Sequence, residues 1–206
     1  MKIVIFGSTG SVGSHVVEQA LRQGHQVTAF TRNPNHVATR HERLTVAQGD
    51  VLDSEAVLRA VAGQDAVVVT LGAGRKGEVR SHGTAAIIDA MQRTGVRRLI
   101  CQSTLGVGES RDSLNFYWKR IMFGLLLRPA YADHVEQERR VRDSDLDWTI
   151  VRPSAFTNGP QTGKYERGFG YDRMTELKIS RADVADFIVD QLTDESFLRA
   201  APAISY

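Results

Sequence analysis

The chain reads Gly7-Ser8-Thr9-Gly10-Ser11-Val12-Gly13 directly after its first apolar run, Lys2–Phe6, and directly before a stretch with helical spacing, Val12–Gln23. The apolar run Lys2–Phe6 is typical of a buried strand, so the glycines lie where a strand is followed by a helix. In such a unit Gly7 permits the tight turn, Gly10 lets an anion approach the backbone, and Gly13 lets the helix pack closely on the strand. Free N–H groups and the helix dipole would then face phosphates. All seven residues are therefore expected to form a dinucleotide site.

The same alternation of apolar runs and helical spacing continues along the chain. The expected strands are Gln26–Thr31, Leu44–Gln48, Ala66–Leu71, Arg98–Gln102 and Trp148–Val151. The expected helices are Ser54–Ala62, His82–Arg93, Asp133–Arg142 and Val184–Leu192, the last behind a capping box of Ser180 and Asp183. This order predicts an α/β fold with a doubly wound parallel sheet, the Rossmann fold. We expect residues 1–206 to form a single domain, with a small C-terminal region that shapes a substrate pocket.

Bulk composition excludes several classes of protein. The net charge of +2, from 26 Lys and Arg against 24 Asp and Glu, argues against nucleic acid or anionic membranes as partners. The longest apolar stretch, Ile121–Leu127, is far below the roughly 20 residues of a membrane span. Cys101 stands alone and the six His are scattered, so no metal site is expected. These features predict a cytoplasmic protein with a small-molecule partner, either monomer or homodimer.

The residue after the second strand discriminates between the two nicotinamide dinucleotides. NAD-selective sites usually carry an acid there, which binds the ribose 2′-hydroxyl. This chain has Arg32 instead, and a guanidinium matches the oxygens of a 2′-phosphate; His36 or Arg40 would assist. A solvated loop arginine is the alternative. The prediction is NADP(H), with NAD(H) less favoured.

Two further segments at strand ends are candidates for the same site. Asp50 and Val51 follow the third strand and would cradle an adenine, although Asp50 would equally serve as a helix cap. Leu71-Gly72-Ala73 ends the fourth strand, where small residues let the backbone run beside ribose and nicotinamide. A plain turn explains that segment too.

Taken together, these residues resemble the atypical short-chain dehydrogenase/reductase superfamily. The resemblance rests on the glycine turn, Gly49-Asp50-Val51, Val61-Ala62-Gly63-Gln64-Asp65-Ala66-Val67 and Trp148-Thr149-Ile150-Val151-Arg152-Pro153. It runs nearly end to end and lies in the NmrA-like, NAD(P)H-binding branch, nearest to the biliverdin and flavin reductases. Thr162-Gly163-Lys164-Tyr165 and Ile179-Ser180-Arg181-Ala182-Asp183 also fit.

The resemblance implies roles for several residues. Ser103 matches a serine that lies near the nicotinamide, His134 matches a histidine of the substrate pocket, and Pro153 would lie at the cofactor. Ser103 and His134 are thus the catalytic candidates. Ala155 stands where the family has a second pocket histidine, and His36 replaces an arginine near the 2′-phosphate. Both departures put the identity of the acceptor in question.

Typical members of the superfamily pair a tyrosine with a lysine four places on, which lets the tyrosine donate a proton. Here Tyr117 is followed at that spacing by Ile121, and Tyr131 by Val135. An NADPH-dependent reductase of flavins or related flat acceptors, such as bilins or quinones, needs no such tyrosine and lysine, because solvent can supply the proton. FMN would be a substrate of such an enzyme. The alternative is a non-catalytic NADP(H) sensor of NmrA type; an epimerase is less favoured.

Overall fold

The computed structural model describes residues 1–72, 77–114, 117–169 and 176–206. Its centre is an eight-stranded sheet in the order β3-β2-β1-β4-β5-β6-β10-β8, parallel except for β8. The strands are β1 (Lys2–Phe6), β2 (Gln26–Thr31), β3 (Leu44–Gln48), β4 (Ala66–Val69), β5 (Arg98–Gln102), β6 (Asp147–Pro153), β8 (Glu166–Gly168) and β10 (Ala203–Ser205). A separate parallel pair joins β7 (Ala155–Thr157) to β9 (Lys178–Ser180). The doubly wound Rossmann fold is thereby confirmed.

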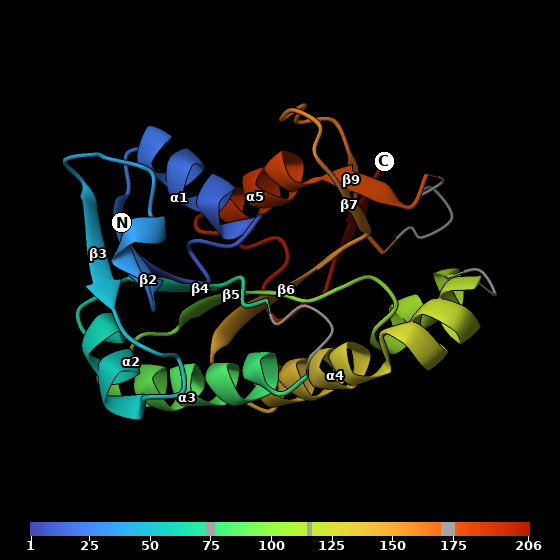
Figure 1. The fold of residues 1–206 in the computed structure, drawn as a ribbon, viewed down its shortest axis with the longest axis horizontal. Helices are drawn as coiled ribbons and strands as arrows, with labels where there is room; N and C mark the ends of the chain where they lie inside the picture. Colours follow the sequence, from blue (N-terminus) through green and yellow to red (C-terminus); the bar gives the residue numbers. More distant parts are fainter. Residues whose placement is uncertain (73–76, 115–116, 170–175) are drawn as a thin grey trace.

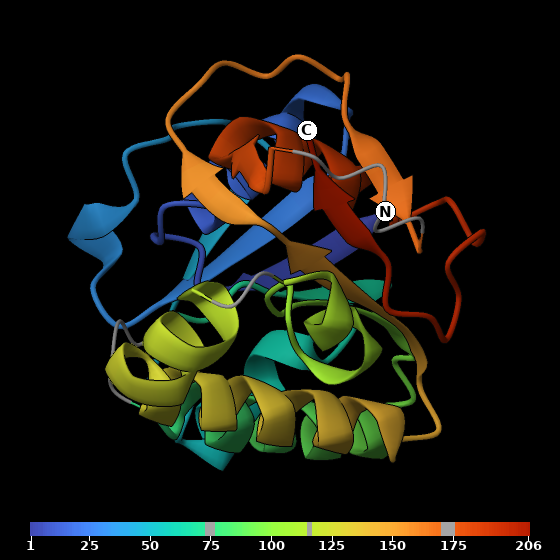
Figure 2. The same ribbon diagram turned by 90° about the vertical axis from the view of Figure 1, so that its right-hand side faces the viewer.

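Helices cover both faces of the sheet (Figure 1). One layer holds α1 (Gly13–Arg22) and α5 (Arg181–Asp190), and the other holds α2 (Ser54–Val61), α3 (Val79–Thr94) and α4 (Arg128–Arg142). A short 3-10 helix, Gly108–Ser113, and a π-helix, Tyr117–Leu126, lie between β5 and α4. In Figure 2 the sheet runs between the two helical layers.

Alternation along the first strand explains the two layers. Ile3 and Ile5 pack into the core beneath α1 and α5, while Val4 and Phe6 pack into the core beneath α2 and α3. All four side chains are completely buried, as expected for a strand covered on both sides. Within the described residues, no helix combines the length and apolarity needed to cross a membrane.

Three helices begin earlier than their sequence pattern predicts. The helix predicted from His82 begins at Val79, because the carboxylate of Asp133 accepts hydrogen bonds from the N–H groups of Arg80 and Ser81. The helix predicted from Asp133 begins at Arg128, with Pro129 in its first turn, a position that proline favours. The last helix likewise begins at Arg181, directly after Ser180, and not at Val184.

Candidate functional site

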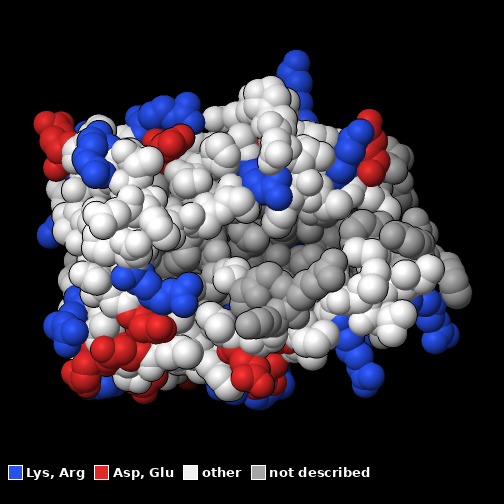
Figure 3. Space-filling model, in the orientation of Figure 1, with Lys and Arg blue, Asp and Glu red and all other residues white. Residues whose placement is uncertain are grey.

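A cavity of about 940 Å³ opens where the parallel strands end. Residues that follow or close five strands line it: Gly7, Thr31, Thr70, Gln102 and Pro153. Figure 3 shows the hollow across the middle of one face, with most of the charged side chains toward the rim of that face. In open α/β sheets, ligands bind at this edge.

The glycine turn is held by contacts that leave no room for side chains. Gly7 has φ +86°, and a Cβ there would lie 2.5 Å from the carbonyl oxygen of Thr70. A Cβ on Gly13 would overlap the carbonyl oxygen of Gly7. The amide of Gly10 donates to that same oxygen at 2.9 Å and closes the turn.

The turn separates into residues that face the cavity and residues that support it. Thr9, Gly10, Ser11 and Val12 join Gly7 in the cavity wall. The hydroxyl of Ser8 turns away and donates to the carbonyl of Phe30 at 2.9 Å. Among the described residues, the amides of Ser11 and Val12 have no hydrogen-bond partner, and unpaired amides at the start of a helix suit a phosphate.

Arg32 follows β2 at the mouth of the cavity and is exposed. Within the described part of the chain its guanidinium forms no ion pair, so it is available to an anion. His36 also lines the cavity, and its Nε2 lies 3.2 Å from the side-chain Nδ2 of Asn33. Arg40 is not in the wall, because its guanidinium donates to the carbonyls of Val37 and Thr39.

Asp50 and Val51 both line the cavity. The helix-cap alternative for Asp50 is wrong, since Asp53 caps α2 and accepts from the N–H groups of Glu55 and Ala56. Oδ1 of Asp50 instead accepts from the amide of Leu52 at 3.0 Å. Leu71 and Gly72 stand opposite, also in the wall, whereas Ala73 lies outside the described residues.

Buried polar atoms without partners mark the inner end of the cavity. Ser103 is 1% exposed, and among the described residues its Oγ has no hydrogen-bond partner. Oε1 of Gln102 and Oγ of Ser154 likewise have no hydrogen-bond partner among the described residues, and both residues line the wall. Buried polar groups are normally paired, so these three atoms fit a ligand that carries both donors and acceptors, such as a carboxamide.

His134 projects from α4 into the same end of the cavity. Burial lowers the pKa of its imidazole from 6.5 to about 3, and the positive charge of Arg80 adds to the effect. The ring is therefore neutral throughout the physiological range, and Nδ1 has no partner in the described part of the chain. A neutral imidazole offers hydrogen bonds but is no ready proton donor.

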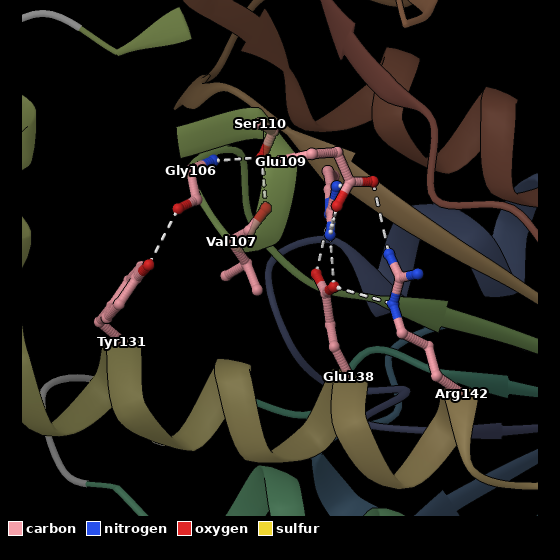
Figure 4. Close-up of polar contacts among 8 residues, drawn as sticks. Gly106, Val107, Glu109, Ser110, Tyr131, Glu138 and Arg142 are labelled. Atoms are coloured by element: carbon pink, nitrogen blue, oxygen red, sulfur yellow. Dashed lines mark hydrogen bonds and ion pairs between the residues drawn. The ribbon is translucent and has the colours of Figure 1, made fainter. Parts of the chain in front are cut away.

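Apolar side chains also line the wall, from Leu105, Leu114, Leu127, Phe156 and Leu177, and the cation of Arg80 lies among the lining residues. The loop after β5 is held in place by α4: Tyr131 donates to the carbonyl of Gly106 at 3.1 Å, as Figure 4 shows. Tyr131 is not part of the wall, so it serves this loop and not the cavity. The thiol of Cys101 is buried and its pKa is raised by burial, as expected for a packing residue.

Sequence reasoning identified most of the residues at strand ends and missed Gln102 and the residues that reach the cavity from elsewhere. Arg80, Gln102, Leu114 and Leu177 carry no local motif. Gln102 is the last residue of a predicted strand, and its place at the carboxyl end was a usable signal. Arg80 was missed because it lies in the first turn of α3, before the predicted start of that helix at His82.

Comparison with known proteins agrees with this geometry. The chain is 30% identical to an uncharacterized chloroplastic protein of Arabidopsis thaliana, over 94% of this chain and 72% of the other. It is 31% identical to a 3-diazoavenalumate denitrifying reductase of a Streptomyces species, over 82% of this chain and 60% of that protein.

Solved structures share the fold. A short-chain dehydrogenase/reductase of Veillonella parvula, in complex with NADP, matches with a TM-score of 0.82 at 24% identity, covering 100% of this chain and 94% of the other. ChuY, an anaerobilin reductase of Escherichia coli, matches with a TM-score of 0.80 at 23% identity, covering 100% and 97%. The family model described as NAD(P)H-binding matches residues 7–195. With that match across the glycine turn and the strand ends that line the cavity, the chain belongs to the NAD(P)H-binding family.

Proposed function

We propose that this chain is an NADPH-dependent reductase of flavins or related flat conjugated acceptors. One observation carries the proposal: the cavity that Ser103 lines is also lined by the apolar side chains of Leu114, Leu127 and Phe156. Flat apolar walls suit a conjugated ring system stacked beside a nicotinamide. The denitrifying reductase and the anaerobilin reductase among its relatives support a reductase as the reaction class.

Named residues would hold the dinucleotide. The amides of Ser11 and Val12 suit the pyrophosphate, Arg32 suits a 2′-phosphate, and Ser103 with Gln102 suits the carboxamide. When bound, NADPH supplies a hydride to the acceptor. The chain contributes orientation and the exclusion of water, which account for much of catalysis when no acid is required.

The proposed reaction uses no side chain of this chain as a proton donor. His134 is neutral above about pH 3, and the hydroxyl of Tyr131 is directed to Gly106. Solvent therefore delivers the proton that completes reduction. The same lack of an acid favours the second candidate, a non-catalytic NADP(H) sensor.

Steady-state turnover separates the two candidates. NADPH oxidation would be followed with FMN, riboflavin, a bilin and a quinone, each at saturating NADPH. The reductase predicts turnover with at least one acceptor and no inflection near pH 6.5 attributable to His134, because that imidazole stays neutral. Binding of NADPH without turnover of any acceptor would favour the sensor.

A further inference from the structure

Arg80 is a buried cation in the wall of the cavity. It occupies the second position of α3, and its side chain is 9% exposed. The N-terminus of a helix carries partial positive charge, so a cation is unfavourable there. A buried arginine in such a place requires compensating negative charge.

The neighbouring carboxylate supplies only part of that compensation. Oδ2 of Asp133 lies 3.4 Å from Nη1 of Arg80, which is long for a charge-assisted hydrogen bond. The same carboxylate accepts from the amide of Ser81 at 2.9 Å and from the amide of Arg80 at 3.2 Å. Glu78, the residue before α3, forms no side-chain cap.

Asp133 is thus mainly the N-terminal cap of α3, and its ion pair with Arg80 is the longest of its contacts. Burial would raise the pKa of this carboxyl, but the hydrogen bonds from Ser81 and Arg80 outweigh that effect and hold the pKa below its usual value. Among the described residues, Nε and Nη2 of Arg80 have no partner. A planar donor pair is left free beside the cavity, a geometry that fits carboxylate or phosphate oxygens.

The anion that fits is on the acceptor. In the proposed site the phosphates of the dinucleotide are bound by the amides of Ser11 and Val12 and by Arg32, so they do not require Arg80. Arg80 lies instead close enough to His134 to lower the pKa of its imidazole, and Leu127 lines the same wall. We propose that Arg80 binds a carboxylate or phosphate group of the acceptor and selects anionic acceptors over neutral ones. This inference rests on the proposed reductase function.

Two flavins test it, because FMN carries a phosphate that riboflavin lacks. The wild-type protein is expected to show a KM for FMN about tenfold below that for riboflavin. Arg80→Met should raise the KM for FMN about tenfold, leaving the KM for riboflavin and for NADPH unchanged, and Arg80→Lys should recover part of the loss. Arg93→Met, an exposed position on the same helix, is the matched control and should change none of the three values.

Each other outcome is decisive. Equal wild-type KM values for the two flavins, or an equal response of both to Arg80→Met, would overturn the inference. A rise in the KM for NADPH with either flavin would assign Arg80 to the cofactor instead. If the wild type reduces neither flavin, the proposed reductase of flavins fails; flavin fluorescence quenching by the NADP⁺-loaded protein then tests Arg80 alone, and equal affinity for FMN and riboflavin would overturn it.

Discussion

At the scale of single residues, Arg32 is the side chain that we expect to distinguish NADPH from NADH. It is an exposed arginine at the end of β2, with no ion pair among the described residues. A charge-assisted hydrogen bond contributes about 1.5–3 kcal/mol, which corresponds to roughly 10- to 100-fold in affinity. We expect Arg32→Ala to weaken NADPH binding by that factor and to leave NADH binding nearly unchanged, as measured by titration calorimetry.

Arg40 provides the control for this prediction. Its guanidinium is bound to the carbonyls of Val37 and Thr39, outside the cavity wall. Arg40→Ala should therefore alter neither affinity. If Arg32→Ala weakened NADPH and NADH equally, the 2′-phosphate would not be what Arg32 recognises.

At the scale of elements, the glycine turn fixes how α1 sits on the sheet. Intrinsic propensity alone predicts that Gly13→Ala stabilises the helix by up to about 1 kcal/mol. The contacts predict the opposite, because the new Cβ would overlap the carbonyl of Gly7 and lie 2.7 Å from Oγ1 of Thr70. Overpacking of this kind costs about 1–3 kcal/mol, so we expect a net loss of stability in urea unfolding and weaker NADPH binding.

Gly159→Ala is the matched control for that substitution. A Cβ at Gly159 would meet its nearest neighbour, the Cβ of Ser180, at 3.5 Å, an ordinary contact. The change should leave unfolding and binding as they are. Stabilisation by Gly13→Ala would mean that α1 can shift away from β1 without cost.

Sequence pattern predicted most elements, and the failures have a physical origin. β1, β2, β3 and β5 match their predicted bounds because short runs rich in apolar and β-branched residues are a local signal. The start of α3 was missed because its cap comes from Asp133, 53 residues from Arg80 along the chain. β7, β8, β9 and β10 have three residues each and depend on partners distant in sequence, so no local pattern reveals them.

At the scale of the whole molecule, the candidate site likewise divides into residues that local sequence pattern predicts and residues placed by contacts distant in sequence. Parallel topology brings all strand ends to one edge, so Arg32, Asp50 and Ser103 were predictable once the strands were. Arg80 and the apolar wall come from helices and loops whose placement depends on tertiary contacts. The part of the cavity proposed to hold the cofactor was thus predictable from sequence, whereas Arg80 and the apolar wall, which we propose contact the acceptor, were not.

An ion-pair network centred on the buried Arg152 joins three parts of the molecule next to the cavity. Arg152 on β6 is completely buried and contacts Glu138 on α4 at 2.6 Å and Glu109 of the loop after β5 at 2.9 Å. Figure 4 shows Glu109, Glu138 and Arg142 converging beneath that loop. Leu105 and Leu114 from the same loop line the cavity, so the network connects sheet, helix and cavity wall.

We expect Glu138→Gln to leave the positive charge of Arg152 poorly compensated. Breaking one partner of a buried pair costs about 3–5 kcal/mol, and the half-exposed Glu109 offsets only part of that. Urea unfolding should report the loss, and hydrogen exchange should increase over residues 105–114. Because the network holds residues 105–114 and includes neither the glycine turn nor Arg32, NADPH affinity should hold while the KM of the acceptor rises. Glu136→Gln on the same helix, whose pairs with Arg139 and Arg140 are at the surface, should change none of these; an equal effect of both variants would show that the network does not position the wall.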